Sequence, residues 1–179
     1  LWAGLGNTGL TSVTRPNGGH MPTITGDLIS LAEAGRFDVI VHGCNCFCAM
    51  GAGIAAAIAA RYPAALAADK ATAFGDRAKL GTFSRADVSH GTHRFVIVNC
   101  YSQFDWQGRG ALVEYDAINT GFRSIAATFP NARIGYPKIG AGLAGGDWAR
   151  IAPLIDTALD GLDHTLVCLP PETPPKGPS

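Results

Sequence analysis

Two glycine-containing loops constrain the fold of this chain most strongly, because each follows an apolar run and precedes a helical pattern. The first reads Met50-Gly51-Ala52-Gly53-Ile54, and the second covers residues 139–146. Glycine reaches positive φ and lets the backbone approach a ligand closely. N–H groups at the start of a helix converge on anions. One such loop suits a phosphate, so two at the same edge of a sheet predict a diphosphate site.

Neither loop has the sequence of the common nucleotide-binding motifs. The Gly-Lys-Ser/Thr ending of a P-loop is missing, as are the dinucleotide-binding glycine spacing and its acidic ribose-binding residue. A single Gly-x-Gly is more often an ordinary turn. The matched pair at two strand-to-helix junctions favours a binding function.

Apolar runs and helical patterns alternate along the chain. Strands are predicted at residues 22–25, 38–42, 81–89, 94–100, 133–136 and 165–169, and helices at 28–34, 53–61, from 63 onward, 113–129 and 147–159. This alternation predicts an α/β fold, a three-layer α/β/α sandwich with a mixed, mostly parallel central sheet. In such sheets ligands bind at the carboxyl ends of the strands.

The length of 179 residues, of which 47% are hydrophobic and 16% charged, predicts one domain with a sizeable core. Residues 1–20 are rich in Gly, Thr and Asn and lead into Gly18-Gly19-His20-Met21, which is typical of an expression-vector junction with Met21 as the native start. We therefore expect a tag at 1–20, the domain at 21–170 and a flexible Pro-rich tail at 171–179.

The balance of charges bears on possible partners. Fourteen basic and fourteen acidic residues give a formal net charge of zero, which argues against nucleic-acid and membrane-surface binding. The sequence lacks a membrane-length apolar stretch and a signal-peptide pattern. Its five cysteines, three of them within five positions, do not resemble a disulfide framework. We expect a cytoplasmic monomer.

Four sequence pieces together resemble a macrodomain. They are Gly26-Asp27-Leu28, His42-Gly43-Cys44-Asn45, Met50-Gly51-Ala52-Gly53-Ile54-Ala55 and Pro137-Lys138-Ile139-Gly140-Ala141-Gly142-Leu143. The resemblance spans residues 23–169. The two glycine loops and Lys79-Leu80-Gly81 look most like the branch that contains the terminal ADP-ribose protein glycohydrolase and the phage and yeast ADP-ribose-1''-phosphatases.

The resemblance implies an ADP-ribose site and assigns residues to it. Asp27 and the backbone of Leu28 would bind adenine, and Asn45 would face the distal ribose. Tyr101 and Gln103, just after a predicted strand, are expected to border the adenosine end. The first loop would hold one phosphate, and the second loop the other phosphate and the distal ribose. The loop residues concerned are Gly51, Ala52, Gly53, Ile54, Gly140, Ala141, Gly142, Leu143 and Ala144.

The leading expectation is hydrolysis of mono-ADP-ribose from acidic side chains of modified proteins, with no cofactor. Lys79 is a candidate catalytic nucleophile, which as a neutral amine would attack the opened sugar; the alternative is a surface lysine. A water positioned by Asn45 and the second loop, and assisted by the substrate's phosphate, is the other route. Ala144 stands where the glycohydrolase has a catalytic Asp, and Asp147 is expected to be a helix N-cap.

Two further functions remain open. A phosphatase acting on ADP-ribose 1''-phosphate would use the same pocket, and a reader would bind ADP-ribose without chemistry. A metal site at Cys44, Cys46 and Cys48 is not expected, because a second cysteine pair is missing. His42, which ends a predicted buried strand, is expected to be a core histidine.

Overall fold

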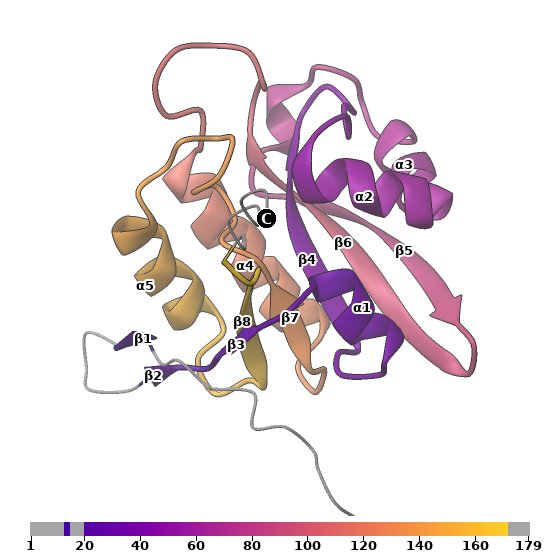
Figure 1. The fold of residues 1–179 in the computed structure, drawn as a ribbon. Coiled ribbons are helices and arrows are strands. Elements are labelled where there is room, and N and C mark those ends of the chain that lie inside the picture. Colours follow the sequence, from indigo (N-terminus) through magenta and orange to yellow (C-terminus); the bar gives the residue numbers. More distant parts are fainter. Residues whose placement is uncertain (1–12, 15–19, 172–179) are drawn as a thin grey trace, which may run out of the picture.

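The centre of the molecule is a six-stranded sheet (Figure 1). A computed structural model describes residues 13–14 and 20–171 of the chain. Neighbouring strands run parallel except at the β5–β6 edge, so the predicted mixed, mostly parallel sheet is confirmed. The order is β3 (Thr23–Thr25), β8 (His164–Cys168), β7 (Ile134–Tyr136), β4 (Val39–Asn45), β6 (His93–Gln103) and β5 (Phe83–His90).

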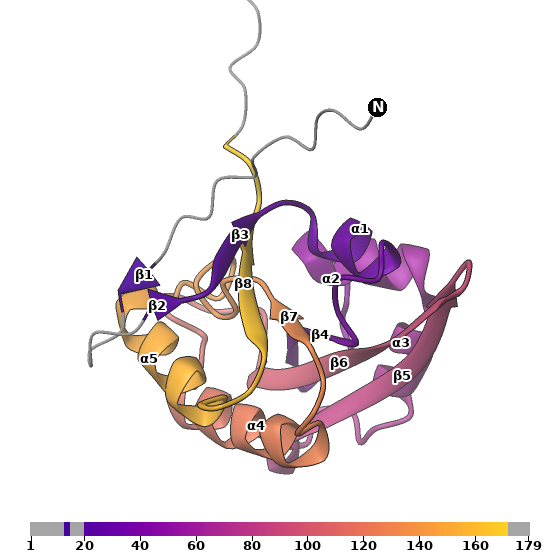
Figure 2. The same ribbon diagram turned by 90° about the horizontal axis from the view of Figure 1, so that it is seen from below.

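Helices cover both faces of this sheet, which confirms the predicted three-layer sandwich (Figure 2). On one face lie α1 (Leu28–Glu33), α2 (Gly53–Arg61) and α3 (Pro63–Lys70), and on the other lie α4 (Tyr115–Thr128) and α5 (Trp148–Ala158). A short 3-10 helix, η1 (Arg77–Lys79), precedes β5. Pro63 occupies the first turn of α3, where its missing N–H costs no hydrogen bond.

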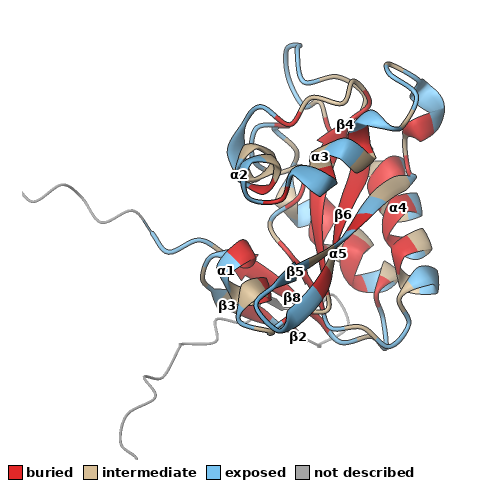
Figure 3. Ribbon diagram, turned by 90° about the vertical axis from the view of Figure 1, so that its right-hand side faces the viewer, coloured by how far each residue is buried: buried red, intermediate tan, exposed pale blue. Residues whose placement is uncertain are grey.

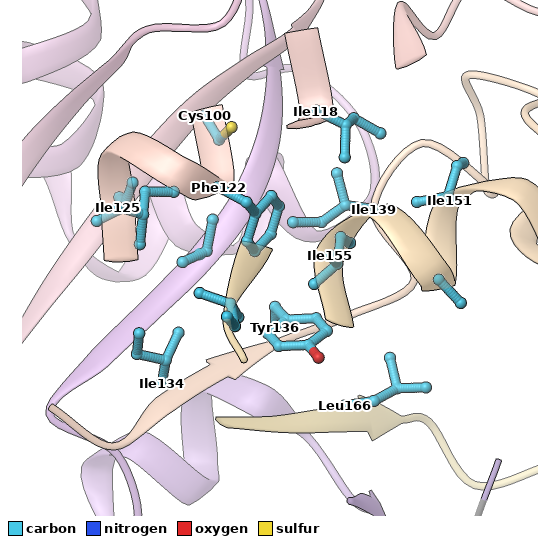
Figure 4. Close-up of a cluster of buried hydrophobic side chains, with 14 of the residues drawn as sticks. Cys100, Ile118, Phe122, Ile125, Ile134, Tyr136, Ile139, Ile151, Ile155 and Leu166 are labelled. Atoms are coloured by element: carbon cyan, nitrogen blue, oxygen red, sulfur yellow. The ribbon is translucent and has the colours of Figure 1, made fainter. Parts of the chain in front are cut away.

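Two apolar cores form because side chains alternate across each strand. In β4, Val39 and Val41 pack with α4 and α5, whereas Ile40 packs with α1–α3. Helix α4 adds Ile118, Phe122 and similar residues at helical spacing to the first core (Figure 4). The central strands are buried along most of their length (Figure 3), which explains their continuous apolar sequence.

Strand β4 extends further than the sequence predicted. It continues through Cys44 to Asn45, where a register shift against β6 places Asn45 opposite Gln103. The predicted hairpin is confirmed, since β5 and β6 pair antiparallel up to His90 and His93. The carboxyl ends of β4 and β6 therefore bring two polar side chains together at one edge of the sheet.

The N-terminal segment contributes one described pairing, in which β1 (Val13–Thr14) runs antiparallel to β2 (His20–Met21). The rest of the predicted tag, and residues 172–179 of the predicted tail, lie outside the described residues. Within the described part of the chain, no helix combines the length and hydropathy needed to cross a bilayer.

Candidate functional site

A cavity of about 670 Å³ opens at the carboxyl ends of β4, β6 and β7. Ligand pockets commonly have volumes of roughly 300–1,000 Å³. Both glycine loops border it, as the sequence predicted for the edge where parallel strands end. Its walls are Gly43, Asn45, Ala49, Gly51, Ala52, Gly53, Ile54, Ala55, Gln103, Trp106, Pro137, Lys138, Ile139, Gly140, Gly142, Leu143 and Ala144.

The first loop presents the start of α2 to the cavity. Gly53 has φ +55°, a conformation that strongly favours glycine, and it begins the helix. The preceding Ala52 makes no side-chain cap, so the first N–H groups of α2 are available to a ligand. These groups and the positive end of the helix dipole favour a phosphate here.

The second loop is closed on itself by backbone hydrogen bonds. Gly146 N donates to Gly140 O (2.7 Å) and Gly145 N donates to Gly142 O (2.9 Å). In the described chain, no backbone carbonyl accepts from the N–H groups of Gly142, Leu143 or Ala144. A tight turn with unused donors at the cavity wall is suited to an anion.

Asn45 lines the cavity but also organises its own loop. Its Nδ2 donates to Ala49 O (2.8 Å), and its Oδ1 accepts from Phe47 N (2.9 Å). An amide nitrogen carries two donors, so one N–H of Asn45 remains for a ligand. The side chain is therefore held rigidly where it meets the cavity.

The structure brings most of the predicted binding residues to the cavity, since both loops, Asn45 and Gln103 line it. Asp27, Leu28, Tyr101, Ala141 and Lys79 do not line it. Asp27 is exposed at the carboxyl end of β3 and caps α1, with its Oδ1 accepting from Ser30 N at 2.7 Å. Leu28 is buried in the core on the α1 side, and Ala141 packs against the other core.

Tyr101 and Lys79 lie in a buried polar network rather than at the cavity. The hydroxyl of Tyr101 donates to Asp69 Oδ1 (2.8 Å), and burial raises the Tyr101 pKa well above its usual value. Lys79 is 6% exposed, so the alternative of a surface lysine is wrong. Its Nζ lies 4.0 Å from Asp69 Oδ1 and 4.3 Å from the centre of the Tyr101 ring.

The Lys79 amine is also bonded to the loop that follows Asn45. It donates to Cys46 O (3.0 Å) and Cys48 Sγ (3.4 Å). Neither partner lines the cavity, but Cys46 directly follows Asn45, which does, so Lys79 is one contact removed from the wall. The predicted attack by Lys79 on a sugar would require these bonds to break.

Seven residues of the wall were not assigned to the site from the sequence, and they are Gly43, Ala49, Ala55, Trp106, Pro137, Lys138 and Ile139. Lys138 directly precedes the second loop within the motif at residues 137–143, and this position is the signal that would have predicted it as a wall residue. Among the wall residues that the structure describes, Lys138 is the one with an ionisable side chain. Ala144 is buried in the wall, and Asp147 caps α5 by accepting from Ala149 N (2.9 Å), as predicted.

His42 is a core histidine, as expected. It is fully buried and its Nε2 lies 2.7 Å from Asn99 Oδ1. Burial disfavours the charged ring and lowers the His42 pKa to about 4. The three neighbouring thiols point to different partners, since Cys44 lies by His42, Cys46 by Gln103 O and Cys48 by Asp69 O.

This sandwich, with paired glycine loops at the ends of β4 and β7, defines an α/β domain whose cavity is suited to a phosphate-containing ligand. The macro domain family model matches residues 41–155. A 17.5 kDa protein from the tk-vs intergenic region of Enterobacteria phage T4 is 35% identical over 149 residues, covering 80% of this chain and 93% of the phage protein. The chain therefore belongs to the macro domain family, which confirms the resemblance found in its sequence.

Solved structures show the same fold. The macrodomain of Mycobacterium tuberculosis DarG superposes with a TM-score of 0.64 at 22% identity, covering 82% of this chain and 95% of that one. Thermosipho africanus DarTG, solved in complex with ADP-ribose, superposes with a TM-score of 0.60 at 18% identity. That match covers 83% of this chain and 41% of the longer DarTG chain.

Proposed function

We propose that this protein binds ADP-ribose and hydrolyses the ester that joins it to an acidic side chain of a modified protein. The carrying observation is the pair of glycine loops, which present free N–H groups across one cavity. A diphosphate between them would meet helix α2 on one side and the second loop on the other. Thermosipho africanus DarTG, which contains the same fold, was solved in complex with ADP-ribose, and this supports the same ligand here.

In this proposal the adenine lies toward Asp27 and the distal ribose toward Asn45. Gln103 was expected to border the adenosine end, but we place it at the distal ribose because it pairs with Asn45 in the β4–β6 register. Asp27 is exposed at the carboxyl end of β3, on the same edge of the sheet as the cavity. Asn45 and Gln103 sit opposite each other at the ends of β4 and β6. Tyr101, which is buried with its hydroxyl bonded to Asp69, is left out of direct contact with the ligand.

The attacking group in this mechanism is water. The water oxygen bonds to C1'' of the distal ribose, the bond from C1'' to the carboxylate oxygen breaks, and the carboxylate leaves with the electron pair. A phosphate oxygen of the ligand takes the water's proton and passes it to solvent. Asn45 and the second loop hold the ribose and the water in place. The ligand's phosphate serves as the base because the described cavity walls contain no Asp, Glu or His.

Lys79 acts in this scheme through the Asn45 loop, to which its amine is bonded. A Schiff base between Lys79 and the opened ribose is the competing route. Borohydride treatment during turnover tests this route. Reduction of the Schiff base would link ADP-ribose to Lys79, and the mass of ADP-ribose would then appear on the proteolytic peptide that contains Lys79. We expect no adduct; an adduct on Lys79 would establish the lysine as the nucleophile.

Turnover of a protein carrying mono-ADP-ribose on glutamate, with free ADP-ribose as the readout, tests the function itself. Release by catalytic amounts of the chain is the expected result. Release of inorganic phosphate from ADP-ribose 1''-phosphate, without turnover of the modified protein, would make the chain a phosphatase. Tight ADP-ribose binding by calorimetry without either activity would make it a reader, a function that the absence of an acidic or histidine side chain from the described walls favours.

The cysteines and the net charge bear on the cellular compartment and the partner. All five cysteines are free thiols, which suits the reducing cytoplasm. A net charge of zero supports a modified protein rather than a polyanion as the partner. We propose a monomer that works in that compartment.

A further inference from the structure

Four aromatic side chains form a cluster beside the cavity. The ring of Phe47 packs edge-on against Phe74 (5.4 Å between centroids), Phe104 (5.1 Å) and Trp106 (5.7 Å). These residues, here called the aromatic cluster, come from three loops that follow β4, α3 and β6. Such edge-to-face contacts are favourable and hold each ring in one orientation.

Backbone hydrogen bonds fix the three loops to one another. Gly75 N donates to Cys46 O (2.9 Å), which ties the Phe74 loop to the Phe47 loop. Cys46 N donates to Phe104 O (2.9 Å), which ties the Phe47 loop to the Trp106 loop. The cluster is therefore a built surface rather than a set of independent side chains.

Part of the aromatic cluster is open to solvent. Phe74 is 73% exposed and Trp106 is 47% exposed. Of the four large exposed apolar residues in the described chain, these two belong to the cluster, and Trp106 and Leu143 line the cavity. An apolar patch around a cavity mouth is typical of a surface that another molecule covers.

The cluster is continuous with the end of the cavity where the distal ribose is proposed to lie. Trp106 belongs to both the aromatic cluster and the cavity wall. The Asp105 carboxylate holds the backbone of Trp106 by accepting a hydrogen bond from its N–H (2.6 Å). Gln103, which lies opposite Asn45 in the β4–β6 register, also lines the cavity and donates to Asp105 O (3.1 Å). Whatever is bonded to C1'' of the distal ribose would leave the cavity beside Trp106 and reach Phe74.

We infer that the aromatic cluster binds the polypeptide that carries the ADP-ribose, through an apolar side chain close to the modified residue. This inference rests on the proposed function, because it needs the distal ribose at Asn45. The charge around the cluster favours a polypeptide over a nucleic acid. Arg77 lies over Phe104 (4.2 Å) and is paired with Glu114 (3.3 Å), so its charge is already balanced.

Peptides joined to C1'' of ADP-ribose through a stable aminooxy linkage test this without any turnover. One peptide has leucine on both sides of the linkage and the other has serine, and fluorescence anisotropy gives the Kd of each. We expect the leucine peptide to bind about tenfold more tightly than the serine peptide, since one apolar side chain becomes buried. Phe74→Ser should bring the ratio of the two Kd values, serine peptide to leucine peptide, close to one. It should leave the Kd of free ADP-ribose unchanged, because Phe74 is outside the cavity.

Leu169→Ser is the matched control, since it removes an equally exposed apolar side chain (74%) that is not in the cluster. It should preserve the ratio. Equal binding of both peptides, with free ADP-ribose still bound, would overturn the inference and leave the proposed function standing. A single-stranded oligonucleotide carrying ADP-ribose that binds more tightly than either peptide would assign the cluster to base stacking instead. Failure of free ADP-ribose to bind would refute the proposed function itself.

Discussion

The amine of Lys79 lies 3.0 Å from the carbonyl oxygen of Cys46, and this contact connects a buried charge to the wall of the cavity. Cys46 follows Asn45, whose amide lines the cavity and bonds the backbone of Ala49. The same amine lies 4.0 Å from the buried carboxylate of Asp69. The position of Asn45 therefore depends on a charge pair that lies behind it.

Lys79→Met should destabilise the fold, because it leaves Asp69 buried without its cation. Asp69 Oδ2 already has no hydrogen-bond partner among the described residues. The free energy of unfolding, from urea denaturation, should fall by about 3 kcal/mol. The double variant Lys79→Met/Asp69→Asn removes both charges and should be more stable than Lys79→Met alone. If the second substitution destabilises further, the charge pair is not what Lys79 provides.

Gly142→Glu should weaken ADP-ribose binding while the fold is kept. A Cβ at Gly142 meets no atom within 4 Å, so a side chain fits without displacing the structure. The carboxylate would then face the ligand's diphosphate, and we expect Kd from calorimetry to rise by at least about tenfold. Gly142→Gln, of the same size but neutral, is the control. A comparable loss with Gln would indicate blockage by size rather than charge.

Gly140→Ala, in contrast to Gly142→Glu, should lower the stability of the fold. Gly140 has φ +75°, and its added Cβ would lie 2.6 Å from Val113. The left-handed backbone and the overpacking together should lower the free energy of unfolding by about 3 kcal/mol. Gly142→Ala, two residues along the same loop, should change it by less than about 0.5 kcal/mol. Equal effects of the two substitutions in thermal or urea unfolding would contradict this difference.

Stability should fall as the pH drops from about 6.5 toward 4, because of His42. Its pKa is about 4 in the folded protein and 6.5 ordinarily, so between these values the unfolded chain binds more protons. The stabilisation is complete above pH 6.5, is lost toward pH 4, and amounts to about 3 kcal/mol. Urea unfolding at several pH values checks this. His42→Gln should have a shallower slope than the parent over this range, and an unchanged slope would assign the effect to other groups.

The fold could be predicted from the sequence because its signals are local. The apolar run that became β4, the spacing of Ile118, Phe122 and Ile125 in α4, and the cap at Asp147 each follow from residues within one or two turns. The two glycine loops were recognised in the same way. Because the carboxyl ends of parallel strands meet at one edge of the sheet, the approximate position of the cavity could also be predicted from the sequence.

The composition of the cavity wall could be predicted only in part. Residues within the motifs, such as Asn45 and Gly142, were found. Trp106 was not assigned to the site, because it stands in a loop without periodicity. Tyr101 was assigned to the ligand because it follows a predicted strand, but β6 continues through it to Gln103, and a strand residue can face either way. The alternation of β6 turns it into the buried network instead.

The sequence by itself determined the class of fold, its glycine loops and its membership of the macro domain family, because these depend on patterns between near neighbours. Only the tertiary structure decided the position of Lys79, since Cys46, Cys48 and Asp69 come from other elements and meet only when β4, α3 and η1 pack together. It also brought Phe74 and Trp106 around Phe47, 27 and 59 residues away from it along the chain. Contacts at such separations depend on the packing of the whole sheet, which no local pattern specifies.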